Sequence, residues 1–131
     1  MAKESVFKGF HGYLFKQIGL IKVSREKSNP LAVIEAEKVL NGGGTVGIFP
    51  EGTRNGLAKG EKVKDGAAFF ALRSGSKVIP CGIKGGEKGN WKLTITYGKP
   101  MDFSEYKGAK DKETLDKVTN EIMDNILSLT K

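Results

Sequence analysis

Residues 45–54 of the chain are Thr-Val-Gly-Ile-Phe-Pro-Glu-Gly-Thr-Arg, an apolar run that passes directly into a polar turn. Thr45 and Val46 are β-branched, and a short apolar run that opens in this way is typical of a buried strand. Pro50 ends the run, because proline has no N–H to donate to a strand ladder. The pattern predicts a strand over residues 45–49, followed by a loop over residues 51–62.

Helical and extended patterns alternate on both sides of this strand. Apolar periodicity predicts helices over residues 5–17, 30–40 and 65–75, and a long C-terminal helix marked by apolar residues from Leu115 to Leu129. Pro30 is expected at a first helical position, and Asp65 and Asp111 are expected to be N-caps. Short β-branched or alternating runs predict the remaining strands, over residues 20–23, 78–83 and 91–97. This order is typical of an α/β fold with a mostly parallel central sheet flanked by helices.

Length and composition fit one soluble domain over residues 1–131. The single cysteine, Cys81, cannot form an intrachain disulfide, and we expect a buried thiol within a strand. No apolar run approaches the roughly 20 residues that span a bilayer. The net charge of +7 would suit anionic partners, but lysines scattered over a solvated surface are the better explanation of the charge taken alone.

The turn after residue 49 carries groups suited to an anion. Gly52 permits close backbone approach, Thr53 offers a hydroxyl, and Arg54 offers a planar fork for phosphate oxygens. Glu51 can accept a hydrogen bond from a hydroxyl or hold the arginine, and Lys64 follows shortly before a predicted helix N-terminus. Composition alone leaves a simple chain reversal open as the alternative.

Residues 49–55, Phe-Pro-Glu-Gly-Thr-Arg-Asn, resemble the Phe-Pro-Glu-Gly-Thr-Arg-Ser block of the 1-acylglycerol-3-phosphate (lysophosphatidic acid) acyltransferase family. Three further stretches resemble blocks of this family in the same order: Gly-Leu-Ile-Lys-Val-Ser-Arg at 19–25, Val-Lys-Asp-Gly-Ala-Ala at 63–68, and Val-Ile-Pro-Cys-Gly-Ile at 78–83. The resemblance covers about residues 1–100 and implies a glycerolipid acyltransferase-like fold.

The resemblance also implies roles for individual residues. Those expected to bind the acceptor phosphate are Arg25, Glu51, Gly52, Thr53, Arg54 and Lys64. Those expected to shape the neighbouring pocket are Phe49, Pro50 and Pro80. The implied reaction of phospholipid biosynthesis transfers an acyl group to lysophosphatidic acid from acyl-CoA or acyl carrier protein, with no further cofactor and no metal. We expect a cytoplasmic location, peripheral at the inner membrane face.

The catalytic block of the family, a histidine followed five positions later by an aspartate, is absent from this sequence. His11 is the only histidine, and Lys16 stands five positions after it. We therefore predict no catalytic residue in this chain, and we expect His11 to pack in the core. Because residues 1–7 resemble the segment that follows the catalytic block, we expect an N-terminally truncated domain whose catalytic segment is lost or encoded separately.

Two other functions remain open on the sequence. A non-catalytic anionic-lipid or phosphate-binding remnant would keep the arginines and need no histidine. Nucleic-acid binding has only the net charge in its favour, without an RNA-recognition or helix-turn-helix signature, and we expect none.

Overall fold

The computed structural model describes residues 2–3, 22–23, 30–51, 60, 62–86, 89 and 91–130. The chain divides into two compact units, a first unit over Met1–Ile48 and a second unit over Phe49–Lys131. The helix predicted over residues 5–17, with His11, lies outside the described residues. The prediction of a single domain stays a prediction.

The described residues of the first unit form two very short parallel strands and one helix. Strands β1 (Ala2–Lys3) and β2 (Lys22–Val23) pair in parallel, which confirms a strand within residues 20–23. Helix α2 (Pro30–Asn41) begins at the predicted proline. It buries Ala32 and Ala36, whereas the larger apolar side chains of Leu31, Ile34 and Val39 are exposed.

The prediction of a strand over residues 45–49 is wrong. The structure assigns no strand to residues 44–49, although Thr45 and Val46 have high β propensity. A strand requires a neighbour that pairs with its N–H and C=O groups, and propensity does not supply that neighbour.

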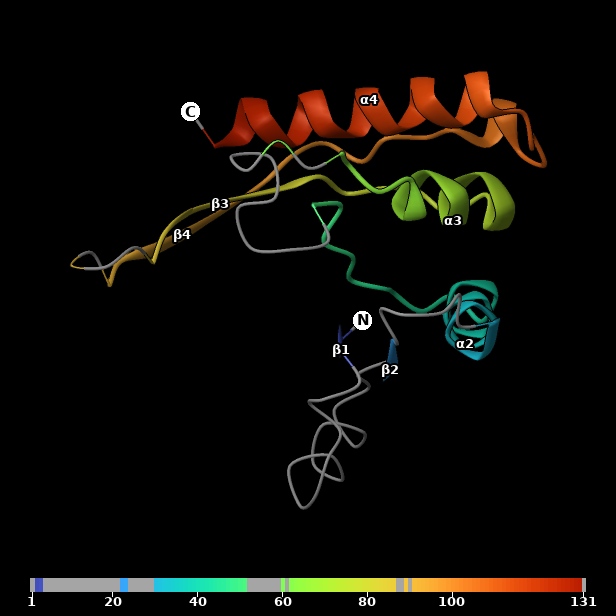
Figure 1. The fold of residues 1–131 in the computed structure, drawn as a ribbon, viewed down its shortest axis with the longest axis horizontal. Helices are drawn as coiled ribbons and strands as arrows, with labels where there is room; N and C mark the ends of the chain where they lie inside the picture. Colours follow the sequence, from blue (N-terminus) through green and yellow to red (C-terminus); the bar gives the residue numbers. More distant parts are fainter. Residues whose placement is uncertain are drawn as a thin grey trace, which may run out of the picture. The chain divides into compact units, whose positions relative to one another are not determined.

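The described residues of the second unit form two α-helices, a short 3-10 helix and an antiparallel hairpin (Figure 1). Helix α3 (Gly66–Ser74) is followed by strands β3 (Cys81–Gly85) and β4 (Leu93–Tyr97), the short 3-10 helix η3 (Ser104–Tyr106) and helix α4 (Lys112–Leu129). Helix α4 lies along both α3 and β3. Parallel pairing among the described residues is confined to β1 and β2, so the mostly parallel central sheet stays a prediction.

The strand predicted over residues 78–83 is shifted along the chain. Val78 forms a separate bridge with Met101, with N···O distances of 2.9 and 2.7 Å, and β3 begins only at Cys81. Pro80 lies between the bridge and β3 and has no N–H for a continuous ladder. The strand predicted over residues 91–97 is confirmed as β4, but all five of its residues are exposed.

The helix ends follow local sequence signals. Helix α3 ends at Gly75, which has a left-handed φ of 73° and donates its N–H to the carbonyl of Ala71. At α4, the Asp111 carboxylate accepts hydrogen bonds from the hydroxyl and the backbone N–H of Thr114, at 2.6 and 2.9 Å. These bonds lower the pKa of Asp111 and confirm its N-cap role. Asp65 precedes α3, but its side chain makes no capping bond.

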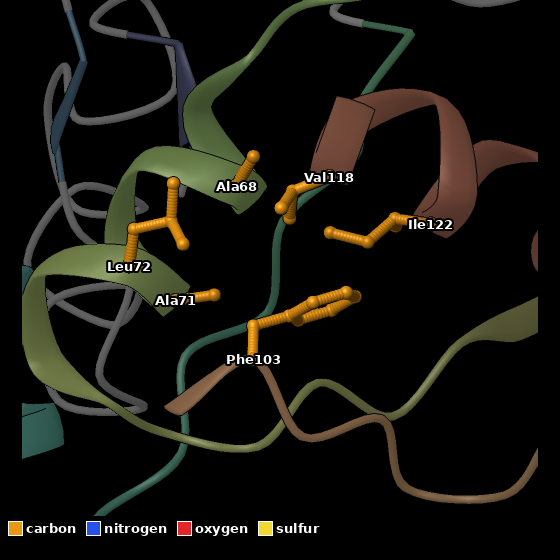
Figure 2. Packing of buried hydrophobic residues seen from close by; sticks show 6 residues of the cluster. All are labelled: Ala68, Ala71, Leu72, Phe103, Val118 and Ile122. Atoms are coloured by element: carbon orange, nitrogen blue, oxygen red, sulfur yellow. The ribbon is translucent and has the colours of Figure 1, made fainter. Parts of the chain in front are cut away.

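The core of the second unit lies where α3 meets α4 and the segment before η3 (Figure 2). Its buried members come from α3, from α4 and from the segment between them: Ala68, Ala71, Leu72, Phe103, Val118 and Ile122. Figure 2 shows their side chains pointing toward one another. The alanines let the two helices approach closely, while the larger side chains fill the remaining space.

Truncation of Leu72, whose side chain is 1% exposed, should destabilise the second unit. We expect Leu72→Ala to lower the free energy of unfolding by about 2–5 kcal/mol, because it leaves a cavity between packed elements. Urea denaturation followed by circular dichroism measures this change. Leu127→Ala is the matched control, because Leu127 on α4 is 44% exposed, and it should change stability by less than about 0.5 kcal/mol. Equal losses in both variants would contradict the assignment of the core.

Candidate functional site

A backbone hydrogen bond closes the base of the loop that contains the Pro-Glu-Gly-Thr-Arg sequence. The Lys64 N–H donates to the carbonyl of Pro50 at 2.8 Å. The bond brings the beginning of the loop next to its end, two residues before α3 starts at Gly66. Glu51, which is half-buried, and Lys64, which is exposed, therefore stand at the two ends of the same loop.

The N-terminus of α3 stands next to this closed base, with charged side chains of both signs around it. Its first turn contains no acidic residue, and the Asp65 side chain makes no capping bond there. The first N–H groups of a helix have no partner within the helix and carry partial positive charge. The exposed side chains of Lys62 and Lys64 add two positive charges just before the helix, and the carboxylates of Asp65 and Glu51 add two negative charges at the same place. The N–H groups of the helix N-terminus are therefore the feature that favours an anion here, since the nearby side-chain charges balance.

The residues expected to shape a pocket lie in different surroundings. Phe49 is 73% exposed, and Pro50 is half-buried. Pro80 is buried, and its carbonyl accepts the N–H of Gly98 at 2.8 Å. A β carbon at Gly98 would lie 2.8 Å from the ring of Pro80, so the absence of a side chain there permits this close packing. The role of these residues in a pocket stays a prediction.

The other expected acceptor-binding residues, Arg25, Gly52, Thr53 and Arg54, lie outside the described residues. The structure thus places two of the six, Glu51 and Lys64, and the convergence of the two arginines stays a prediction. The backbone bond between Lys64 and Pro50 was not anticipated from the sequence. The sequence carries no signal for this bond, because the backbone of every residue except proline can donate one.

Three further observations bear on the chemistry of the chain. Cys81 is a free thiol, but it is half-buried at the start of β3 and not fully buried as expected. Among the described residues, no group of three acidic, histidine or cysteine side chains is arranged to hold a metal ion. Within the part of the chain that the structure describes, no helix combines the length and the apolar character needed to cross a membrane.

Comparisons with known proteins agree on one family. The family model described as Acyltransferase matches residues 1–84. The chain is 28% identical over 135 aligned residues to the 1-acyl-sn-glycerol-3-phosphate acyltransferase of Bacillus subtilis (strain 168), covering 98% of the chain and 67% of that relative. It is 35% identical over 83 residues to a protein of the same name from Borreliella burgdorferi, covering 61% of the chain and 33% of that relative.

No solved structure gives a significant match to the chain. The chain spans about two thirds of the length of the first relative and about one third of the second.

A substitution at Lys64 separates the backbone bond from the side-chain charge. Lys64→Pro removes the N–H that donates to Pro50, and we expect it to lower the free energy of unfolding by about 0.5–1.5 kcal/mol. Lys64→Ala keeps the N–H and should change stability by less than about 0.5 kcal/mol. Urea denaturation followed by circular dichroism reports both values. If the alanine variant loses as much stability as the proline variant, the backbone bond is not the stabilising contact.

Proposed function

Because the chain belongs to the acyltransferase family, we propose that it forms the acceptor-phosphate-binding part of a 1-acyl-sn-glycerol-3-phosphate acyltransferase. The family match over residues 1–84 agrees with the sequence blocks that resemble this family. The acceptor in this proposal is lysophosphatidic acid, and the acyl donor is a thioester of coenzyme A or of acyl carrier protein.

The closed base of the loop is the observation that supports this proposal most directly. The bond from Lys64 to Pro50 holds both ends of the loop at the N-terminus of α3, whose first turn has no acidic residue, although Asp65 directly precedes it. In the proposal, Thr53 and Arg54 complete the site, because a hydroxyl and a guanidinium donate to phosphate oxygens. Arg25 supplies a second guanidinium, so that the dianionic phosphate is surrounded by cations and donors.

The proposed reaction needs a base that this sequence lacks. The acceptor hydroxyl would attack the thioester carbonyl, give its proton to a histidine and release the donor thiol. His11 is the only histidine of the chain, and no aspartate stands five positions after it. We therefore assign the catalytic histidine and aspartate to a segment outside this chain and assign acceptor binding to the chain itself.

Three finer features belong to the same proposal. The parallel pair β1–β2 would be part of a mostly parallel central sheet. Phe49, Pro50 and Pro80 would line the wall beside the phosphate. The protein would act on the cytoplasmic side, in peripheral contact with the inner membrane face, where its lipid acceptor is found.

Binding of sn-glycerol 3-phosphate tests the acceptor site without requiring catalysis. We expect Arg54→Ala to weaken binding by about 10- to 100-fold, because it removes a hydrogen bond between charged groups. Arg73→Ala is the matched control, since Arg73 lies in the last turn of α3, where its guanidinium stacks 5.5 Å from the centre of the Phe69 ring. Isothermal titration calorimetry measures both affinities. An equal loss with Arg73→Ala would show that general charge, and not the loop, attracts the ligand.

The second candidate function is a non-catalytic phosphate-binding remnant, which would not need the missing histidine and aspartate. An activity assay distinguishes this remnant from a part of an enzyme. We expect the chain alone to show negligible turnover of lysophosphatidic acid and acyl-CoA, because loss of a general base typically costs about 10²- to 10⁴-fold in rate. Addition of a family segment that carries the histidine and aspartate should restore turnover. Phosphate binding without restored turnover would identify a remnant. Turnover by the chain alone that His11→Ala abolishes would contradict the proposal.

A further inference from the structure

Strand β4 forms an open edge of the β3–β4 hairpin. It pairs with β3 on one side, and within the described part of the chain no further strand pairs with it on the other. Helix α4 packs against β3, where a β carbon at Gly82 would lie 2.7 Å from the β carbon of Leu129. All five residues of β4 are exposed. The outer edge of β4 is therefore accessible to another strand.

The hydrogen bonds of the hairpin show which backbone groups of β4 point outward. The N–H of Gly98 donates to the carbonyl of Pro80 at 2.8 Å, in the same register as the ladder between the strands. Hydrogen-bonded and non-hydrogen-bonded pairs alternate along an antiparallel ladder, so Thr94 and Thr96 bond to β3. The N–H and C=O groups that point away from β3 belong to the other residues of β4: Leu93, Ile95 and Tyr97.

The composition of β4 offers no protection against pairing with another chain. Exposed edge strands usually carry a lysine, a proline or a bulge that prevents such pairing. Strand β4 reads Leu-Thr-Ile-Thr-Tyr and contains no charge and no proline. Its register with β3 is continuous over all five residues, so it has no bulge. Its β-branched and aromatic residues also favour the extended conformation. The edge is thus suited to receive a strand.

Strand β4 is complementary to a second copy of itself. An antiparallel pairing centred on Ile95 places the outward-pointing backbone groups of the two copies opposite one another. Ile95 then pairs with Ile95, and Leu93 pairs with Tyr97, and each pair exchanges two hydrogen bonds. A shift by one residue would set outward groups against inward ones, and a shift by two would shorten the ladder. The backbone therefore favours this register.

The side chains that meet in this register form favourable pairs. On one side of the sheet, Thr94 lies opposite Thr96 of the second copy. On the other side, Leu93 lies opposite Tyr97, and the β-branched Ile95 lies opposite itself. Hydroxyl pairs of threonine, pairs of β-branched side chains and pairs of an aromatic with an apolar side chain all stabilise antiparallel sheets.

The lysines beside β4 do not oppose the pairing. Lys92 directly precedes the strand and would lie opposite Gly98 of the second copy. Lys99 would lie opposite Trp91, whose exposed ring attracts a cation. Like charges that lie directly opposite destabilise a sheet, and neither lysine lies opposite another. The charges next to the strand are therefore compatible with a second copy.

We propose that two copies of the chain associate through an antiparallel pairing of β4 with β4, about a two-fold axis at Ile95. The two hairpins then form one continuous sheet in the order β3–β4–β4–β3. A contact between two strands is smaller than the interface of an obligate dimer, so we expect weak and reversible association. The inference goes beyond the proposed acyltransferase function and does not depend on the acceptor site.

Sedimentation velocity of the full chain measures the association. We expect single chains of 14.2 kDa at low concentration and dimers of twice this mass as the concentration rises from about 1 μM to about 100 μM. A chain that stays monomeric would overturn the proposal. Assemblies larger than a dimer would also overturn it, because one pairing occupies the whole edge of β4. Arg54→Ala should dimerise as the unaltered chain does, so failure of the acceptor site and failure of this pairing give different results.

Two matched variants place a lysine at the pairing edge or away from it. Ile95→Lys puts like charges directly opposite at the two-fold axis, and we expect it to weaken dimerisation by about tenfold or more. Ile83→Lys is the control, because Ile83 lies on the same side of the hairpin and both isoleucines are 46% exposed. The two copies of position 83 would be separated by about 14 Å, beyond the Debye length of about 10 Å at 0.1 M salt. Equal losses would identify face-to-face packing of the hairpins and overturn the edge pairing.

Opposite charges at position 95 test the register. Ile95→Glu alone should also weaken dimerisation, because two carboxylates then meet at the axis. A mixture of Ile95→Lys and Ile95→Glu should associate, since a lysine then lies opposite a glutamate. Circular dichroism checks that both variants keep the fold. Folded variants that do not associate in the mixture would overturn the pairing about Ile95.

Hydrogen exchange followed by NMR tests the unaltered chain and does not depend on the folding of a variant. The N–H groups of Thr94 and Thr96 should be protected at every protein concentration, because they bond to β3. Those of Leu93, Ile95 and Tyr97 should gain protection only as the dimer forms. If the protection of these three groups does not change with concentration, the proposal is wrong.

Discussion

The packing of α3 against α4 is the interaction on which the second unit depends. Ala68 and Ala71 on α3 bring the helices close, and Val118 and Ile122 on α4 fill the contact together with Leu72. Phe103, from the segment before η3, completes the cluster. Because both helices are anchored here, each can hold a different functional region in place. The N-terminus of α3 holds the base of the loop, and the C-terminal end of α4 supports the hairpin.

The loop depends on this core through a small number of backbone contacts. The bond from Lys64 to Pro50 links the beginning of the loop to the residue just before α3. Since α3 is fixed by its buried alanines and Leu72, the base of the loop is fixed with it. Backbone N–H groups that are already fixed cost little to arrange when a ligand binds, which would favour the proposed anion site at this helix N-terminus.

Much of the local structure and the family were determined by the sequence itself. The start of α2 at Pro30, the end of α3 at Gly75 and the Asp111 cap of α4 follow from residues within one helical turn of each other. The family resemblance and the missing histidine–aspartate block are likewise properties of the linear sequence.

Other features were decided only by the tertiary structure. Residues 45–49 have the composition of a strand but form none, and the apolar side chains of β4 are exposed although their pattern favours partial burial. Pro50 and Lys64 are joined by a hydrogen bond between backbone atoms, and the backbone is nearly the same in every residue type. Strand pairing, burial and such backbone contacts depend on which distant segments meet in space, and that depends on the packing of the whole unit and not on any local pattern.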